Sequence, residues 1–142
     1  MAAQLRIDVL EEIGRGGCGV VHRARLHERA GPREVAVKLL GAGASLKQQE
    51  AFIVEIKKSQ IIGNKCTGVV TIYGAMPRDG QTMLVMKLYK GSLADKLEAA
   101  GALPLATALR YGRQALRALK SLHEHGGAAL DGLGPPRAVK CP

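Results

Sequence analysis

The sequence of 142 residues has few aromatic side chains: one phenylalanine, three tyrosines and no tryptophan. Proteins that bind single-stranded nucleic acids stack the bases on aromatic rings. We therefore expect no nucleic-acid partner, although the formal net charge is +9. Hydrophobic residues make up 46% of the chain, which is enough for a folded core. That core must be filled by leucine, valine, isoleucine and alanine.

Cysteine is also scarce, and the sequence shows no pairing pattern. Cys18, Cys66 and Cys141 are widely spaced, and no histidine stands at a metal-ligand spacing from any of them. This pattern predicts free thiols in a reducing compartment and no metal site. The N-terminus lacks the apolar stretch of a signal peptide, and no window approaches the ~20 apolar residues of a membrane span. We expect a soluble, cytoplasmic protein of at most one domain.

The most informative stretch lies between Ile13 and Val21. It reads G-x-G-x-x-G-x-V, with its three motif glycines at Gly14, Gly16 and Gly19. A glycine-rich turn lets backbone N–H groups approach phosphate oxygens because no Cβ stands between them. The run Val-Ala-Val-Lys at residues 35–38 follows, and its lysine can add a positive charge to the same phosphates. Together the two motifs predict a nucleotide-binding site.

The residues after the last glycine discriminate between nucleotide-binding folds. A dinucleotide-binding fold would begin a helix at Gly19. Residues 20–26 instead begin with two β-branched valines, lack an N-cap and then alternate polar and apolar side chains. They predict a strand, so the glycines lie in a hairpin. A Walker-type loop is excluded because no Gly-Lys-Ser/Thr follows.

Periodicity and turn signals predict the remaining elements. We expect strands at 5–12, 20–26, 34–40, 69–73 and 82–88, with turns at 30–33 and 77–80. Residues 46–62 predict a helix that begins after Ser45, with Gln48 as the second member of a capping box. A second helix is expected at 104–123, where a leucine stripe lies beside a basic row. That row consists of Arg110, Arg113, Arg117 and Lys120.

A hairpin with a glycine-rich turn, followed by a strand that ends in lysine, is the arrangement of the protein-kinase small lobe. The chain thus resembles the eukaryotic protein kinases, of the serine/threonine or tyrosine-kinase-like type. The resemblance implies an α+β fold, with a five-stranded antiparallel sheet and one αC-type helix followed by the first helices of the α-helical large lobe. It implies a small lobe at 1–89, a hinge end with large-lobe helices at 90–125, and a divergent, disordered tail at 126–142.

The resemblance also implies which residues bind ATP. Gly14, Gly16 and Gly19 would cradle the phosphates. Lys38 would hold the α- and β-phosphates, and Glu55 would orient Lys38 through an ion pair. The other ATP-binding residues that it implies are Ile13, Val21, Ala36, Met86, Lys87 and Tyr89.

Glu55 is the partner that this resemblance assigns to Lys38. A buried ammonium that holds phosphates is kept charged and oriented by a carboxylate. Two alternatives remain open from the sequence. Glu50 can replace Glu55 as the partner of Lys38, or Glu55 can form a solvated pair with Lys58 on an exposed helix face.

The resemblance ends after residue 126, where a kinase enters its catalytic loop. Counting from His123 places Asp131 in register with the catalytic aspartate, and an ordinary Asp-Gly turn is the alternative. The family's other loop positions hold Ala129, Leu130, Leu133 and Pro136, and no D-F-G follows. The protein ligands for Mg²⁺ that a complete domain would use are therefore missing.

We expect the chain to be the amino-terminal part of a kinase domain, truncated at the catalytic loop. It would bind ATP and, in a complete form, transfer phosphate to serine, threonine or tyrosine hydroxyls of a protein substrate. Alone it would be inactive. One alternative is a non-catalytic kinase-like module that binds nucleotide or a partner kinase. Another is a peripheral binder of anionic surfaces that uses the basic row.

Overall fold

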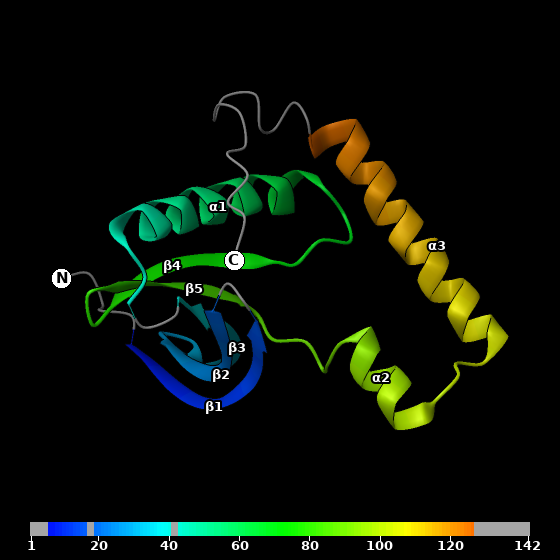
Figure 1. The fold of residues 1–142 in the computed structure, drawn as a ribbon, viewed down its shortest axis with the longest axis horizontal. Coiled ribbons are helices and arrows are strands. Elements are labelled where there is room, and N and C mark those ends of the chain that lie inside the picture. The colour runs from blue at the N-terminus through cyan, green and yellow to red at the C-terminus, as the bar shows by residue number, and fades with distance from the viewer. Residues whose placement is uncertain (1–5, 17–18, 41–42, 127–142) are drawn as a thin grey trace.

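A computed structural model of the chain describes residues 6–16, 19–40 and 43–126. Five strands form one antiparallel sheet in the order β1-β2-β3-β5-β4; one helix lies between the third and fourth strands along the chain, and the other helices follow the fifth (Figure 1). This α+β architecture confirms the fold expected from the sequence. The strands are β1 (Arg6–Gly16), β2 (Gly19–Glu28), β3 (Gly31–Leu39), β4 (Ile72–Arg78) and β5 (Gln81–Lys87). The helices are α1 (Leu46–Lys65), α2 (Leu93–Ala100), α3 (Leu105–Ser121) and a π-helical turn, η1 (Leu122–Gly126).

The sheet has an apolar cluster on each face, because successive side chains of a strand point to opposite sides. One face carries a cluster from β2, β3 and β5. The other face of β5 packs against α1, which lies along β4 and β5 (Figure 1). The first cluster consists of Ala24, Leu26, Val35, Val37, Met83 and Val85, and the second of Phe52, Ile56 and Leu84.

Helix α1 begins where the capping signal predicts. The Ser45 hydroxyl accepts a hydrogen bond from the Gln48 backbone N–H, and the Gln48 side chain accepts one from the Ser45 N–H. The helix extends to Lys65, three residues beyond the expected end at 62. Packing of α1 on the sheet overrides the weak helix propensity of Gly63 and Asn64.

Several strand boundaries differ from the sequence prediction by two residues or more: β1 extends to Gly16 and β2 to Glu28, and β3 and β4 also differ. The fourth strand was expected at 69–73, but β4 runs from Ile72 to Arg78 and includes Pro77. An edge strand tolerates proline because one side of its backbone needs no ladder hydrogen bonds, and β4 is the edge of this sheet. Similarly, β3 begins at Gly31 instead of residue 34 and includes Pro32. This proline lies outside the part of β3 that pairs with β5, which begins at Val35.

Helix α3 contacts the loop that follows α1. The Thr67 backbone N–H donates to the Ser121 hydroxyl at 3.0 Å, and the Cys66 thiol donates to the Ser121 carbonyl at 3.6 Å. Gly68, at φ +78°, lies so close to α3 that a Cβ there would be 2.6 Å from the Ala118 Cβ. The loop at 66–68 therefore positions α3 relative to the sheet.

The outer faces of α2 and α3 are exposed. Every residue of α2 is exposed, and neither helix contains a buried residue. The leucine stripe expected on α3 lies on its surface, with Leu105 75% and Leu116 67% exposed. Over the described part of the chain, no helix is both long and apolar enough to cross a membrane.

Candidate nucleotide-binding site

The glycine-rich segment forms the hairpin that the sequence predicts. Strands β1 and β2 pair with Gly14 opposite Val21 and Gly16 opposite Gly19, and residues 20–26 are strand throughout. The two residues between Gly16 and Gly19 lie outside the described residues. We call residues 13–16 and 19–21 the flap hairpin.

The backbone at Gly19 requires glycine for two reasons. Its φ of +130° is rarely adopted by residues with a side chain, and an added Cβ would collide with the Leu39 carbonyl oxygen. Gly16 is different, because among the described residues nothing apart from its immediate chain neighbours lies within 4 Å of the position where its Cβ would be. The space beside Gly16 is therefore open to a ligand group such as a phosphate.

Lys38 lies in a row of residues that crosses the sheet. Gly14 of β1 faces Val21 of β2, Val21 faces Lys38 of β3, and Lys38 faces Leu84 of β5. Residues directly opposite in an antiparallel sheet lie on the same face. Lys38 is thus on the same face of the sheet as Gly14. Helix α1 covers this face where it packs on β5.

Glu55 does not form the expected ion pair in this structure. Among the described residues, no carboxylate lies within 4.0 Å of the Lys38 ammonium, so Glu50 is not its partner either. Glu55 is exposed on α1, and no ion pair joins it to Lys58 within that distance. The Lys38 Nζ instead lies 5.8 Å from the centre of the Phe52 ring. The reason is rotational: Phe52 and Ile56 face the sheet, which turns Glu55 toward the flank of the helix.

The residues expected around adenine lie next to one another on the same sheet face. Ala36 is 5% exposed and faces Arg23 on one side and Met86 on the other. Met86 packs against the cluster beneath α1, and Val21 is half-buried. Ile13, on β1, is 47% exposed. An apolar strip that a flat base can cover therefore adjoins the row containing Lys38.

The chain leaves the sheet at Lys87. Its N–H already donates to the Thr71 carbonyl at 2.9 Å and is therefore not available to a base. Tyr89 lies beyond the strand, and its hydroxyl accepts a hydrogen bond from the Thr71 N–H at 3.4 Å. This bond ties the Tyr89 side chain to the beginning of β4 and leaves its backbone at the edge of the strip.

The candidate catalytic residue Asp131 lies outside the described residues. Within those residues, no group of three or more histidine, cysteine, aspartate or glutamate side chains is placed to hold a metal ion. The described residues therefore offer no carboxylate cluster that fits Mg²⁺.

Arg23 is a residue of this site that the sequence prediction did not single out. Its guanidinium contacts Glu11 of β1 at 3.2 Å and Glu34 of β3 at 2.5 Å. The hydrogen bond to Glu34, followed by the attraction of both carboxylates, raises the pKa of Arg23 above its usual range. The alternating charges on neighbouring strands were the available signal, but their pairing depends on strand register.

The sequence matches a known family model over most of its length. Residues 7–127 match the model described as protein tyrosine and serine/threonine kinase. A probable serine/threonine-protein kinase zyg-1 of Caenorhabditis briggsae is 35% identical over 116 residues, which are 81% of this chain and 15% of that protein. The protein kinase of the outer chloroplast membrane 1 of Arabidopsis thaliana is 33% identical over 128 residues, which are 84% of this chain and 20% of that protein.

A probable LRR receptor-like serine/threonine-protein kinase of Arabidopsis thaliana is 37% identical over 102 residues, 71% of this chain. The chain spans a fifth or less of the length of each of these relatives. Their names describe serine/threonine kinases or a kinase of an organelle membrane. Because the family match extends from residue 7 to residue 127, this chain belongs to the protein tyrosine and serine/threonine kinase family.

Proposed function

We propose that this chain binds ATP beneath the flap hairpin and that, within a complete kinase domain, it serves phosphoryl transfer to serine or threonine hydroxyls of a protein substrate. The supporting observation is the row Gly14–Val21–Lys38 across three strands. It places a flexible backbone and a compact positive charge on one face of the sheet. Both are suited to phosphate oxygens.

The base would lie along the apolar strip of Val21, Ala36 and Met86, with Ile13 above it at the flap. The Lys87 carbonyl and the Tyr89 N–H would supply hydrogen bonds to its edge. This placement follows from strand register: moving from Lys38 to Ala36 leads away from the glycine turn, from the phosphate end toward the base end. In a complete domain, which would supply the metal ligands missing here, Mg²⁺ would neutralise phosphate charge.

Glu55 would approach Lys38 when nucleotide binds. The ammonium group already lies near the α1 residue Phe52, one helical turn from Glu55. A rotation of α1 about its own axis would bring the carboxylate toward the lysine. We therefore retain Glu55 as the proposed partner of Lys38 in the nucleotide-bound form.

We infer that the 142-residue chain alone does not transfer phosphate. The sequence has no D-F-G, and the position of the metal-binding asparagine holds Pro136. Transfer depends on positioned metal ions and electrostatic stabilisation. We place the protein in the cytoplasm, where ATP is available and a free thiol such as that of Cys66 stays reduced.

Titration with fluorescent ATP tests the binding site. The Lys38→Met variant should bind at least about tenfold more weakly, because a charged contact contributes about 1.5 kcal/mol or more. Lys47→Met, at an exposed position of α1, is the matched control and should bind as the wild type does. Equal affinity of wild type and Lys38→Met would contradict the proposal.

Incubation with labelled ATP, Mg²⁺ and generic protein acceptors tests catalysis separately. We expect no transfer above the level of the Lys38→Met control. Clear transfer by the wild type would show that the chain alone is active.

One observation favours a second candidate, a module that binds a partner kinase. The leucines of α3 are exposed, including Leu109 at 53% and Leu116 at 67%. In a partner-binding module these side chains would contact the partner, so Leu109→Asp and Leu116→Asp should abolish co-elution with a purified kinase while ATP binding persists. Co-elution that survives both substitutions would exclude this face.

A further inference from the structure

The base of the flap hairpin contains a break in the β1–β2 ladder. Pairing is regular from Arg6–His27 to Val9–Ala24, resumes at Glu12–His22 and shifts once more before Gly14–Val21. Leu10 and Glu11 of β1 therefore face the single residue Arg23 of β2. This two-against-one arrangement is a β-bulge, which bends a strand and changes the direction of the residues after it.

The Arg23 side chain bridges three strands at this bulge. One guanidinium nitrogen contacts the Glu11 carboxylate at 3.2 Å, and the other contacts the Glu34 carboxylate at 2.5 Å. Glu11 belongs to the bulge itself, and Glu34 lies on β3, the strand that carries Lys38. Side-chain ion pairs thus connect the strands where the backbone ladder is interrupted.

The bridge lies on the face of the sheet that we assign to the nucleotide. Arg23 is opposite Ala36 and two residues from Val21, so all three side chains lie on one face. After this bulge, β1 continues through Glu12 and the second register shift into the flap residues Ile13 and Gly14. The angle of the bulge therefore sets the position of the flap relative to Lys38.

We propose that Arg23 is a positioning residue for the nucleotide: by holding Glu11 and Glu34 together, it fixes the bulge and thereby the height of the flap hairpin over the phosphates. This inference rests on the proposed function, since it presupposes ATP beneath the flap. It goes beyond that function because it assigns Arg23 an indirect role. Its effect passes through the two carboxylates to the backbone of β1.

If Arg23 had a purely structural role, its removal would affect stability and not nucleotide affinity. Arg23 is 38% exposed, with Glu11 and Glu34 56% and 47% exposed, and exposed ion pairs contribute little to stability. Removing the bridge should then have small effects on folding and none on affinity. A positioning role predicts a selective loss of nucleotide affinity with a small change in melting temperature.

The experiment compares Arg23→Gln and Glu11→Gln with Arg6→Gln in the full chain. Arg6 also forms an exposed ion pair, with Asp8 at 3.1 Å. Both residues lie on β1, before the bulge. Arg23→Gln should raise the Kd for fluorescent ATP roughly fivefold, as about 1 kcal/mol of lost interaction gives. Glu11→Gln should have a smaller effect in the same direction, and Arg6→Gln none. Arg23→Lys, which keeps the charge, should recover part of the loss.

Amide hydrogen exchange without nucleotide provides a second measurement. Exchange at Gly14 and Gly16 should be faster in Arg23→Gln than in the wild type and unchanged in Arg6→Gln. Wild-type affinity and wild-type exchange in Arg23→Gln would overturn the inference while leaving the proposed function intact. If the wild type binds no ATP, the proposed function fails first and the inference fails with it.

Discussion

The ammonium nitrogen of Lys38 lies 5.8 Å from the centre of the Phe52 ring, on the face of β3 that turns toward α1. At this distance an aromatic face attracts a cation. The ring thus occupies the place beside the lysine where a carboxylate was expected. Phe52 is 3% exposed and belongs to the cluster that joins α1 to the sheet, so it links the position of the helix to the surroundings of the lysine.

Phe52→Ala should destabilise the protein by about 3 kcal/mol or more, because it leaves a cavity in the cluster with Ile56 and Leu84. Urea denaturation measures the loss. Ile53→Ala is the control, since Ile53 is the next residue of α1 and is 36% exposed. Equal losses for the two variants would contradict the packing described for α1.

Alanine substitutions at two flap glycines should have different effects, one on stability and the other on ATP binding. Gly19→Ala should cost about 2 kcal/mol, because its backbone is strained for alanine and its Cβ would meet the Leu39 carbonyl. Gly16→Ala should fold normally, since the space around its Cβ is open, but should weaken ATP binding by filling that space. Urea denaturation and fluorescent ATP titration measure the two effects. A Gly16→Ala variant that binds ATP normally would show that the phosphates do not approach Gly16.

The loop at 66–68 should hold α3 in place through Gly68. Gly68→Ala and Gly80→Ala introduce a side chain at the same φ of +78°, but only the first meets a neighbour, the Ala118 Cβ. Gly68→Ala should therefore be less stable than Gly80→Ala by about 1–3 kcal/mol, the range for an overpacked contact. Amide exchange at Thr67, which donates to Ser121, should also become faster in Gly68→Ala only. Similar behaviour of both variants would argue against the contact.

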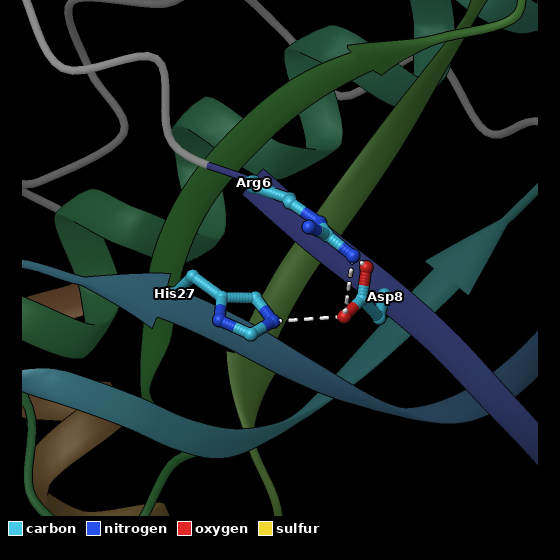
Figure 2. A network of polar contacts seen from close by, with 3 residues as sticks. All are labelled: Arg6, Asp8 and His27. Atoms are coloured by element: carbon cyan, nitrogen blue, oxygen red, sulfur yellow. Dashed lines mark hydrogen bonds and ion pairs between the residues drawn. The ribbon is translucent and has the colours of Figure 1, made fainter.

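Stability should fall in acid through Asp8, whose carboxylate contacts His27 at 2.8 Å and Arg6 at 3.1 Å (Figure 2). The hydrogen bond with His27, followed by that with Arg6, lowers the pKa of Asp8 from its ordinary value of 3.8. Because the folded-state pKa is below that of the unfolded chain, this contribution is present above about pH 3.8 and is lost as the pH falls through the lowered pKa.

The titration of Asp8 can be followed by NMR of its carboxyl carbon. His27→Ala removes the largest cause of the shift, so it should move the pKa of Asp8 back toward 3.8. Asp8→Asn should remove the corresponding acid-dependent loss in urea denaturation. An unchanged Asp8 titration in His27→Ala would contradict the network in Figure 2.

The sequence by itself determined the elements whose signals are local. The glycine hairpin, the strand after it and the capping box at Ser45 each depend on neighbouring residues, and the structure confirms all three. Turn chemistry and the alternation of a strand act over a few residues, so they can be recognised without tertiary information.

Only the tertiary structure decided which distant residues meet. The place of Pro77 within β4 depends on that strand being at the sheet edge, and Arg23 reaches Glu11 and Glu34 only in one strand register. The neighbour of Lys38 is set by the rotation of α1 about its axis, which the packing of Phe52 fixes. Phe52 and Glu55 are three residues apart, and a helix turns about 100° per residue, so their side chains differ by only about 60° around the axis and a modest rotation would exchange a ring for a carboxylate.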